Sequence, residues 1–214
     1  MPPAPRPRRS YDQYCAAARA LDTVGDRWTL LIVRELLVGP RRYTDLHADL
    51  PGVSTDVLAS RLKDMEREAL ATRRRLPPPS AAYVYELTER GRELLPVLQA
   101  LATWGAPALG ERAPTDAVRA HWFALPLLRA LAGLGVEGVV EVRLDEGEFH
   151  VRLGGAGESY GDGPAPADPD ARLAMDAETC VAVSGGVLTV GDGVRAGRIE
   201  LSGESVLAKA LRAS

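Results

Sequence analysis

The chain has 214 residues, a net charge of −3 and 46% hydrophobic residues, which suits two small domains that each bury a core of their own. No apolar stretch resembles a signal peptide or suits a membrane span, so we expect a cytoplasmic protein without a membrane partner. Cys15 and Cys180 form neither a disulfide framework nor a zinc-ligand spacing, and no metal or other cofactor is expected.

The charge is divided unevenly along the chain. Residues 1–110 hold 16 basic and 13 acidic residues, a net charge of +3, whereas residues 111–214 hold 10 and 16, a net charge of −6. This asymmetry is typical of a basic half that contacts nucleic acid joined to an acidic half with another role.

The first half reads as a series of helices followed by a hairpin. Residues 1–10, rich in proline and arginine, are expected to form a disordered basic arm. Apolar residues at helical spacing then predict helices in residues 11–24, 28–38, 44–50 and 55–70. Residues 71–76 and 82–87 predict a β-hairpin with a proline-rich tip. Thr88 suits the cap of a last helix that runs to about residue 107, where Pro96 would introduce a bend.

This element order is typical of a helix-turn-helix with a wing, and the residues from Cys15 to Trp104 resemble the HxlR family. The matching stretches are LD at 21–22, GDRWTLLI at 25–32, GPRRYTDL at 39–46, LPGVS at 50–54, LASRLKDME at 58–66, YELTERG at 85–91 and LPVL at 95–98. The resemblance implies a winged helix-turn-helix regulator that binds double-stranded DNA, at a palindromic operator, as a homodimer. It also implies that the fourth helix enters the major groove and that the terminal helices form the dimer.

Polar and basic side chains of this half are the candidates for DNA contact, because duplex recognition needs cations near phosphates and short polar groups at base edges. The groove candidates, on the exposed face of the fourth helix, are Ser54, Thr55, Ser60 and Lys63. The backbone candidates, in the turn before the third helix and in the wing, are Arg41, Arg42, Arg73, Arg74 and Arg75.

Cys15 admits two interpretations. The family resemblance places it close to the reactive thiol of redox-sensing members, where a thiolate could form an intersubunit disulfide or an adduct. Its helical spacing with Ala18 and Leu21 equally fits a small buried core residue, which is the interpretation we favour.

The second half mixes helices and strands. After a linker in residues 106–114, Thr115 suits the cap of a helix that runs to about residue 131, divided or bent at Pro126. Alternating residues predict an antiparallel hairpin, residues 140–144 and 149–153, followed by a loop over residues 154–170. A strand in residues 171–175, a helix opened by Asp176, a strand in residues 197–202 and a helix in residues 204–212 complete the prediction.

The stretches ARLAMD at 171–176 and GRIELSGE at 197–204 resemble the sterol carrier protein fold, an α+β domain with an apolar ligand tunnel. The resemblance implies a small apolar effector bound in this half. The expected lining is Trp122, Phe123, Leu127, Leu128, Val142, Leu144, Phe149, Val151, Ile199 and Leu201. The alternatives are a half that only supports the dimer or binds another protein, and a carrier of apolar ligands whose DNA-binding half is vestigial.

No catalytic constellation is expected, because the three histidines fall in separate elements without a neighbouring nucleophile. We therefore predict a non-enzymatic α+β protein: an arm at 1–10, a winged helix-turn-helix domain at 11–109 and a sterol-carrier-like domain with a mostly antiparallel sheet at 114–214. The predicted function is a DNA-binding transcriptional regulator modulated by an apolar ligand, with a thiol-based redox regulator as the alternative.

Overall fold

The computed structural model describes residues 10–110, 112–154 and 159–214, and the predicted arm lies outside these residues except for Ser10. Contacts within the chain divide it into two compact units, residues 1–98 and residues 99–214. The division falls inside one helix, so we describe each unit by itself.

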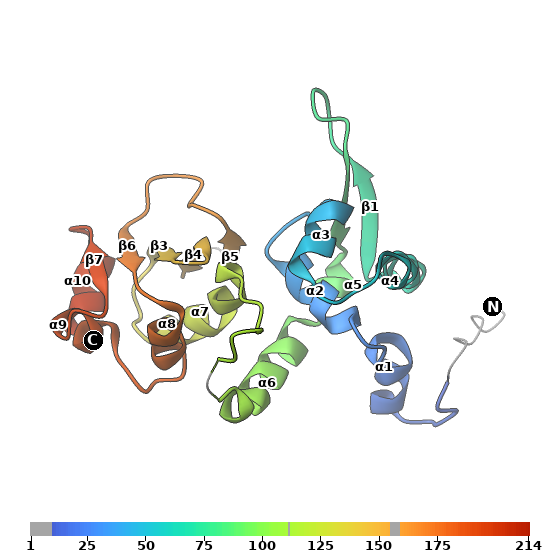
Figure 1. Ribbon diagram of the computed structural model, residues 1–214, viewed down its shortest axis with the longest axis horizontal. Helices are drawn as coiled ribbons and strands as arrows, with labels where there is room; N and C mark the ends of the chain where they lie inside the picture. The colour runs from blue at the N-terminus through green and yellow to red at the C-terminus, as the bar shows by residue number, and fades with distance from the viewer. Residues whose placement is uncertain (1–9, 111, 155–158) are drawn as a thin grey trace. The chain divides into compact units, whose positions relative to one another are not determined.

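The first unit has the predicted order of four helices, a hairpin and further helix. Its elements are α1 (Ala16–Val24), α2 (Thr29–Leu37), α3 (Tyr43–Asp49), α4 (Thr55–Arg67), β1 (Ala71–Arg75), β2 (Tyr83–Leu87), α5 (Glu89–Arg92) and the start of α6 (Leu95–Gly105). The hairpin β1–β2 extends beyond the helices, and α3 and α4 contact its two strands near the base (Figure 1). This is a winged helix-turn-helix arrangement.

The prediction of a single helix after the hairpin is wrong, because the chain forms two helices there, α5 and α6. Thr88 caps the short α5 by accepting a hydrogen bond from the Gly91 N–H at 3.1 Å, as predicted. Pro96 is the second residue of α6, where a missing N–H breaks no helical hydrogen bond. Proline therefore sits at the beginning of a new helix and does not bend an existing one.

One hydrophobic core holds the first unit together. Its largest side chains come from α2, α3 and α4 and from the segments that join them: Ile32, Leu46, Leu50, Leu58, Leu62 and Met65. Gly91 packs so closely on the Leu70 backbone that an added Cβ would lie 2.0 Å from its carbonyl oxygen. The corner between the hairpin and α5 therefore requires glycine.

The second unit is a mixed α+β fold. Its elements after α6 are the 3-10 helices η1 (Ala106–Ala108) and η2 (Ala120–Phe123), then α7 (Ala124–Ala132), β3 (Gly138–Leu144), β4 (Gly147–Leu153), β5 (Ser159–Asp162), β6 (Ala171–Ala174), α8 (Ala177–Ser184), α9 (Val190–Arg195), β7 (Glu200–Ser202) and α10 (Val206–Ala213). The strand order is β5-β4-β3-β6-β7, with β3 and β6 parallel and the other neighbouring pairs antiparallel. A mostly antiparallel sheet is thus confirmed.

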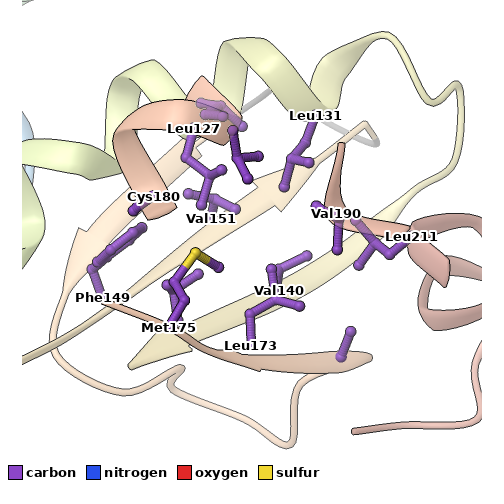
Figure 2. Packing of buried hydrophobic residues seen from close by; sticks show 14 of the residues in the cluster. Leu127, Leu131, Val140, Phe149, Val151, Leu173, Met175, Cys180, Val190 and Leu211 are labelled. Carbon is purple, nitrogen blue, oxygen red and sulfur yellow. The ribbon is translucent and has the colours of Figure 1, made fainter. Parts of the chain in front are cut away.

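The core of this unit lies between the sheet and the helices α7 and α8. Leu127 and Leu131 of α7 point toward strand residues such as Val140 and Val151 (Figure 2). Asp176 caps α8, as predicted, with its carboxylate 2.6 Å from the Thr179 N–H.

Three features differ from the sequence prediction. The helix predicted from residue 115 begins only at Ala120, with η2. Pro126 does not break or bend it but lies in the first turn of α7, where the backbone nitrogen needs no hydrogen-bond partner. The predicted loop over residues 154–170 contains the edge strand β5, and α9 forms in a glycine-rich segment.

Among the described residues, no helix combines the length and the apolar character needed to cross a membrane.

Candidate nucleic-acid interface

Helix α4 presents a polar face to solvent because its apolar stripe is fully used by the core. Leu58, Leu62 and Met65 are buried, and Ser54 caps the helix by accepting a hydrogen bond from the Val57 N–H at 3.3 Å. All four groove candidates, Ser54, Thr55, Ser60 and Lys63, are exposed. Lys63 has no ion-pair partner within the described part of the chain, so its ammonium group is available to a phosphate.

The start of α3 is attached to the wing through the backbone. Arg41 forms an isolated β-bridge with Tyr85, with N···O distances of 2.9 and 2.8 Å in the two directions. The Arg41 side chain is only 15% exposed and lies 3.8 Å from the Asp49 carboxylate, which favours a structural role. Arg42 is exposed, and its guanidinium donates to the Ser80 hydroxyl at 3.3 Å, near the wing tip.

The three arginines of β1 have different surroundings. Arg74 makes two hydrogen bonds of 3.0 Å to the Glu86 carboxylate, so its charge is paired. Arg73 lies over the Tyr83 ring at 4.1 Å, and Arg75 donates to the Ala81 carbonyl at 3.4 Å. Alternation along the strand places Arg73 and Arg75 on the opposite face from Arg74.

Two further contacts of α4 were not predicted. The Tyr43 hydroxyl donates to the Thr55 carbonyl at 2.8 Å and so fixes α3 against the start of α4. Arg61 bonds the carboxylate of Asp26, from the turn between α1 and α2, and lies 3.3 Å from Asp64. The three-residue spacing of Arg61 and Asp64 could have predicted the second pair, whereas no local pattern indicates the first.

Cys15 is exposed in the single chain, so the favoured interpretation as a core residue is wrong for this structure. It occupies the position before the first turn of α1, where hydrogen bonds from the backbone N–H groups of Ala18 and Ala17 lower the pKa of its thiol. Cys180 is fully buried, and burial raises the pKa of its thiol to about 12. Cys15 is thus the more reactive of the two.

Large apolar side chains of two helical segments are exposed in the single chain. Tyr14 and Leu21 belong to the α1 segment, and Val97, Leu101 and Trp104 belong to α6, with Trp104 83% exposed. The α6 helix has no buried residue at all. Exposed apolar helix faces of this kind are typical of protein contact surfaces.

The predicted ligand-lining residues of the second unit, apart from Trp122, belong to its hydrophobic core or pack against it. Seven of the ten, among them Leu127, Val142 and Phe149, are buried, and Trp122, Phe123 and Leu201 are partly buried. Figure 2 shows such side chains pointing toward each other between helices and sheet. An open pocket of about 270 Å³ lies elsewhere, at the ends of β3 and β6, and Leu144 is the one predicted residue that lines it.

The comparisons with known proteins match the N-terminal part of the chain. The HxlR-like helix-turn-helix family matches residues 23–113, so this match does not bear on the sheet of the second unit. The chain is 37% identical over 86 residues to YvaP of Bacillus subtilis, an uncharacterized HTH-type transcriptional regulator, with 40% of this chain and 80% of YvaP covered.

Two further comparisons concern YodB of Bacillus subtilis, an HTH-type transcriptional regulator. The chain is 35% identical to it over 85 residues, with 40% of this chain and 76% of YodB covered. The solved structure of the reduced form of YodB is 31% identical to this chain, with a TM-score of 0.41, and the match covers 49% of this chain and 100% of that chain. These relatives are named as transcriptional regulators, which confirms the prediction that the chain is not an enzyme.

Proposed function

Because the chain belongs to the HxlR-like helix-turn-helix family, we propose that it regulates transcription by placing α4 in the major groove of an operator. The observation that carries the proposal is the exposed polar face of α4, with Ser60 and Lys63 able to face the groove. Arg42 and the Arg73 face of the wing would contact the flanking phosphates, because they are exposed and not paired with a carboxylate in the described residues.

The test is a binding titration against a duplex selected by the parent protein from a random-sequence library, at several salt concentrations. Lys63→Ala should lower the slope of log affinity against log salt by about one unit for each protomer, because one phosphate contact is lost. Ser60→Ala should change base preference more than the slope. Lys209→Ala, at an exposed position of α10, is the matched control. Equal slopes for the parent and Lys63→Ala would show that Lys63 does not contact a phosphate, and an unchanged base preference in Ser60→Ala as well would exclude α4 from the interface.

We further propose that two chains associate through the exposed apolar residues of α1 and α6 and read a palindromic operator. Burial of side chains such as Trp104 removes apolar surface from water, which favours association. Trp104→Glu should therefore give a monomer in light scattering and weaker operator binding. Val187→Glu is the control, since Val187 is 85% exposed in the second unit. A dimeric Trp104→Glu protein would contradict this assignment of the interface.

A second candidate function is a thiol-based response through Cys15. The exposure of Cys15 favours it, as do the backbone hydrogen bonds that lower the pKa of its thiol, because the thiolate is the form that reacts with oxidants. If this function operates, diamide should release operator DNA from the parent and from Cys180→Ser, but not from Cys15→Ser. Equal release from all three proteins would exclude it.

An effector-binding role for the second unit rests on its pocket rather than on its core. Leu144 and Met175 supply apolar surface there. Charges of both signs also line the pocket, from Arg143, Arg198, Asp145 and Glu200, so the lining favours a small molecule that carries both apolar and charged groups. The sterol-carrier likeness and the carrier alternative remain predictions. Ala174→Phe, which fills the pocket, should abolish any effector response and leave operator affinity unchanged; Ala196→Phe, on the exposed end of α9, is the control. A retained response would place the effector elsewhere.

A further inference from the structure

The turn between α1 and α2 has a specific, strained shape. Trp28, the residue before α2, has φ of 82°, in the left-handed region that a bulky side chain rarely adopts. Its ring is partly buried against the core of the first unit. The Thr29 N–H donates to the Asp26 carbonyl at 3.2 Å and closes the turn. Packing therefore holds a conformation that the backbone alone would not favour.

Two contacts join this turn to the DNA-reading segment. The Asp26 carboxylate bonds the guanidinium of Arg61, in the middle of α4. The Trp28 ring lies beside Gly52, in the turn before α4, where an added Cβ would be 3.9 Å from the ring. The turn that precedes α4 and the middle of α4 thus both lie close to one short turn.

The basic residues of α4 consequently fall into two groups. Arg61 is 21% exposed and lies between Asp26 and Asp64, and Arg67 is 2.6 Å from Asp64 and 3.1 Å from Glu68. Lys63 has no such partner within the described residues. An arginine whose charge is balanced by two nearby carboxylates attracts a phosphate less than an unpaired cation does.

From these contacts we propose that Arg61 is a positioning residue for operator binding, which ties α4 to the turn after α1 through Asp26 and does not contact DNA. The proposal rests on the proposed function, because it assumes that α4 enters the groove. Asp26 follows the end of α1 by two residues. This ion pair therefore makes the orientation of α4 depend on α1, the helix that Cys15 precedes.

The test compares Arg61→Gln, Asp26→Asn and the double variant in the full chain, titrated with the duplex selected by the parent protein. Each single variant should bind about five-fold more weakly, the upper range for a partly exposed ion pair, and the double variant should be no weaker. The salt slope should stay at the parent value in all three, since no phosphate contact is lost. Arg61→Lys should recover part of the affinity, and Arg67→Gln is the matched control on the same helix.

Three results would overturn the proposal. A slope lowered in Arg61→Gln as it is in Lys63→Ala would make Arg61 a phosphate contact. Normal affinity in Asp26→Asn together with weak binding in Arg61→Gln would show that the Asp26–Arg61 ion pair does not affect operator binding. Additive losses of affinity in the double variant would show the same. Failure of the proposed function looks different, because then Lys63→Ala also leaves affinity and slope unchanged.

Discussion

The substitutions Arg73→Ala and Arg74→Ala separate two kinds of wing arginine. These neighbours share charge, size and strand, but Arg74 is paired with Glu86 and Arg73 is stacked on Tyr83. If Arg73 contacts one phosphate in each protomer, Arg73→Ala should lower the salt slope by about 0.9 per protomer and about 1.8 per dimer. Between about 50 and about 200 mM salt, the parent should then lose about twelve-fold more affinity than the variant.

Arg74→Ala should leave slope and affinity nearly unchanged, because the Arg74–Glu86 pair is partly exposed and contributes little to stability. The assay is fluorescence anisotropy with a labelled operator duplex at four or more salt concentrations, with circular dichroism to show that both variants fold. The opposite pattern, a lowered slope in Arg74→Ala and a parental slope in Arg73→Ala, would refute the reasoning from ion pairing. It would mean that Glu86 releases Arg74 when DNA binds.

Three further predictions concern reactivity and stability. Alkylation of Cys15 by iodoacetamide should rise with pH through a midpoint below that of an ordinary free cysteine, because backbone hydrogen bonds lower the pKa of its thiol. Buried Cys180 should stay unmodified in the native protein, and equal rates at both thiols would contradict this. Asp176→Ala should lower the free energy of unfolding, measured in urea at pH 7, by about 1 kcal/mol, because α8 loses its N-terminal cap. Because the folded-state pKa of Asp176 is lowered, that contribution is present above the unfolded value of about 3.9 and is lost as pH falls through the folded value; a deficit that persists in full at the lowest pH would argue against the charged cap. Gly91→Ala should lower the free energy of unfolding by more than about 2 kcal/mol, because the added methyl group would clash with the Leu70 backbone. Gly105→Ala, with open space around it, should lower it by less than about 0.5 kcal/mol, and similar melting temperatures for the two variants would contradict the packing at Gly91.

The helices of the first unit were predictable because local and tertiary signals agree there. Leu58, Leu62 and Met65 recur at helical spacing, and Ser54 stands where a cap is needed. The α9 helix shows the opposite case, since Gly191 and Gly193 disfavour a helix locally. Added Cβ atoms there would lie 2.3 Å from the Ser214 carbonyl oxygen and 2.4 Å from the Ile199 side chain. Close packing, invisible in the local pattern, requires these glycines.

The candidate site shows the same limit for side-chain pairing. Sequence reasoning placed Arg73, Arg74 and Arg75 together in the wing but could not tell which one is neutralised. The choice of arginine depends on the hairpin register, in which Thr72 is opposite Glu86. Arg74 is two residues beyond Thr72, so it lies on the same face as Glu86 and diagonally across from it. The bond between Asp26 and Arg61 spans 35 residues, so it depends on how the α1–α2 turn meets α4. Pairings of this range follow from the fold and not from local spacing.

Counting basic residues therefore overstates the charge that this chain can direct at DNA. The first half holds 16 basic residues, yet Arg61, Arg67 and Arg74 each bond carboxylates of the same unit. A paired arginine shapes the surface and orients elements, but it releases few counterions, because its charge is already balanced nearby. Lys63 and Arg73 carry charge that no carboxylate in the described residues balances, and they project from α4 and the wing. Since counterion release drives much of the affinity, the strength of DNA binding should follow these unbalanced cations, whereas its geometry should follow the paired ones.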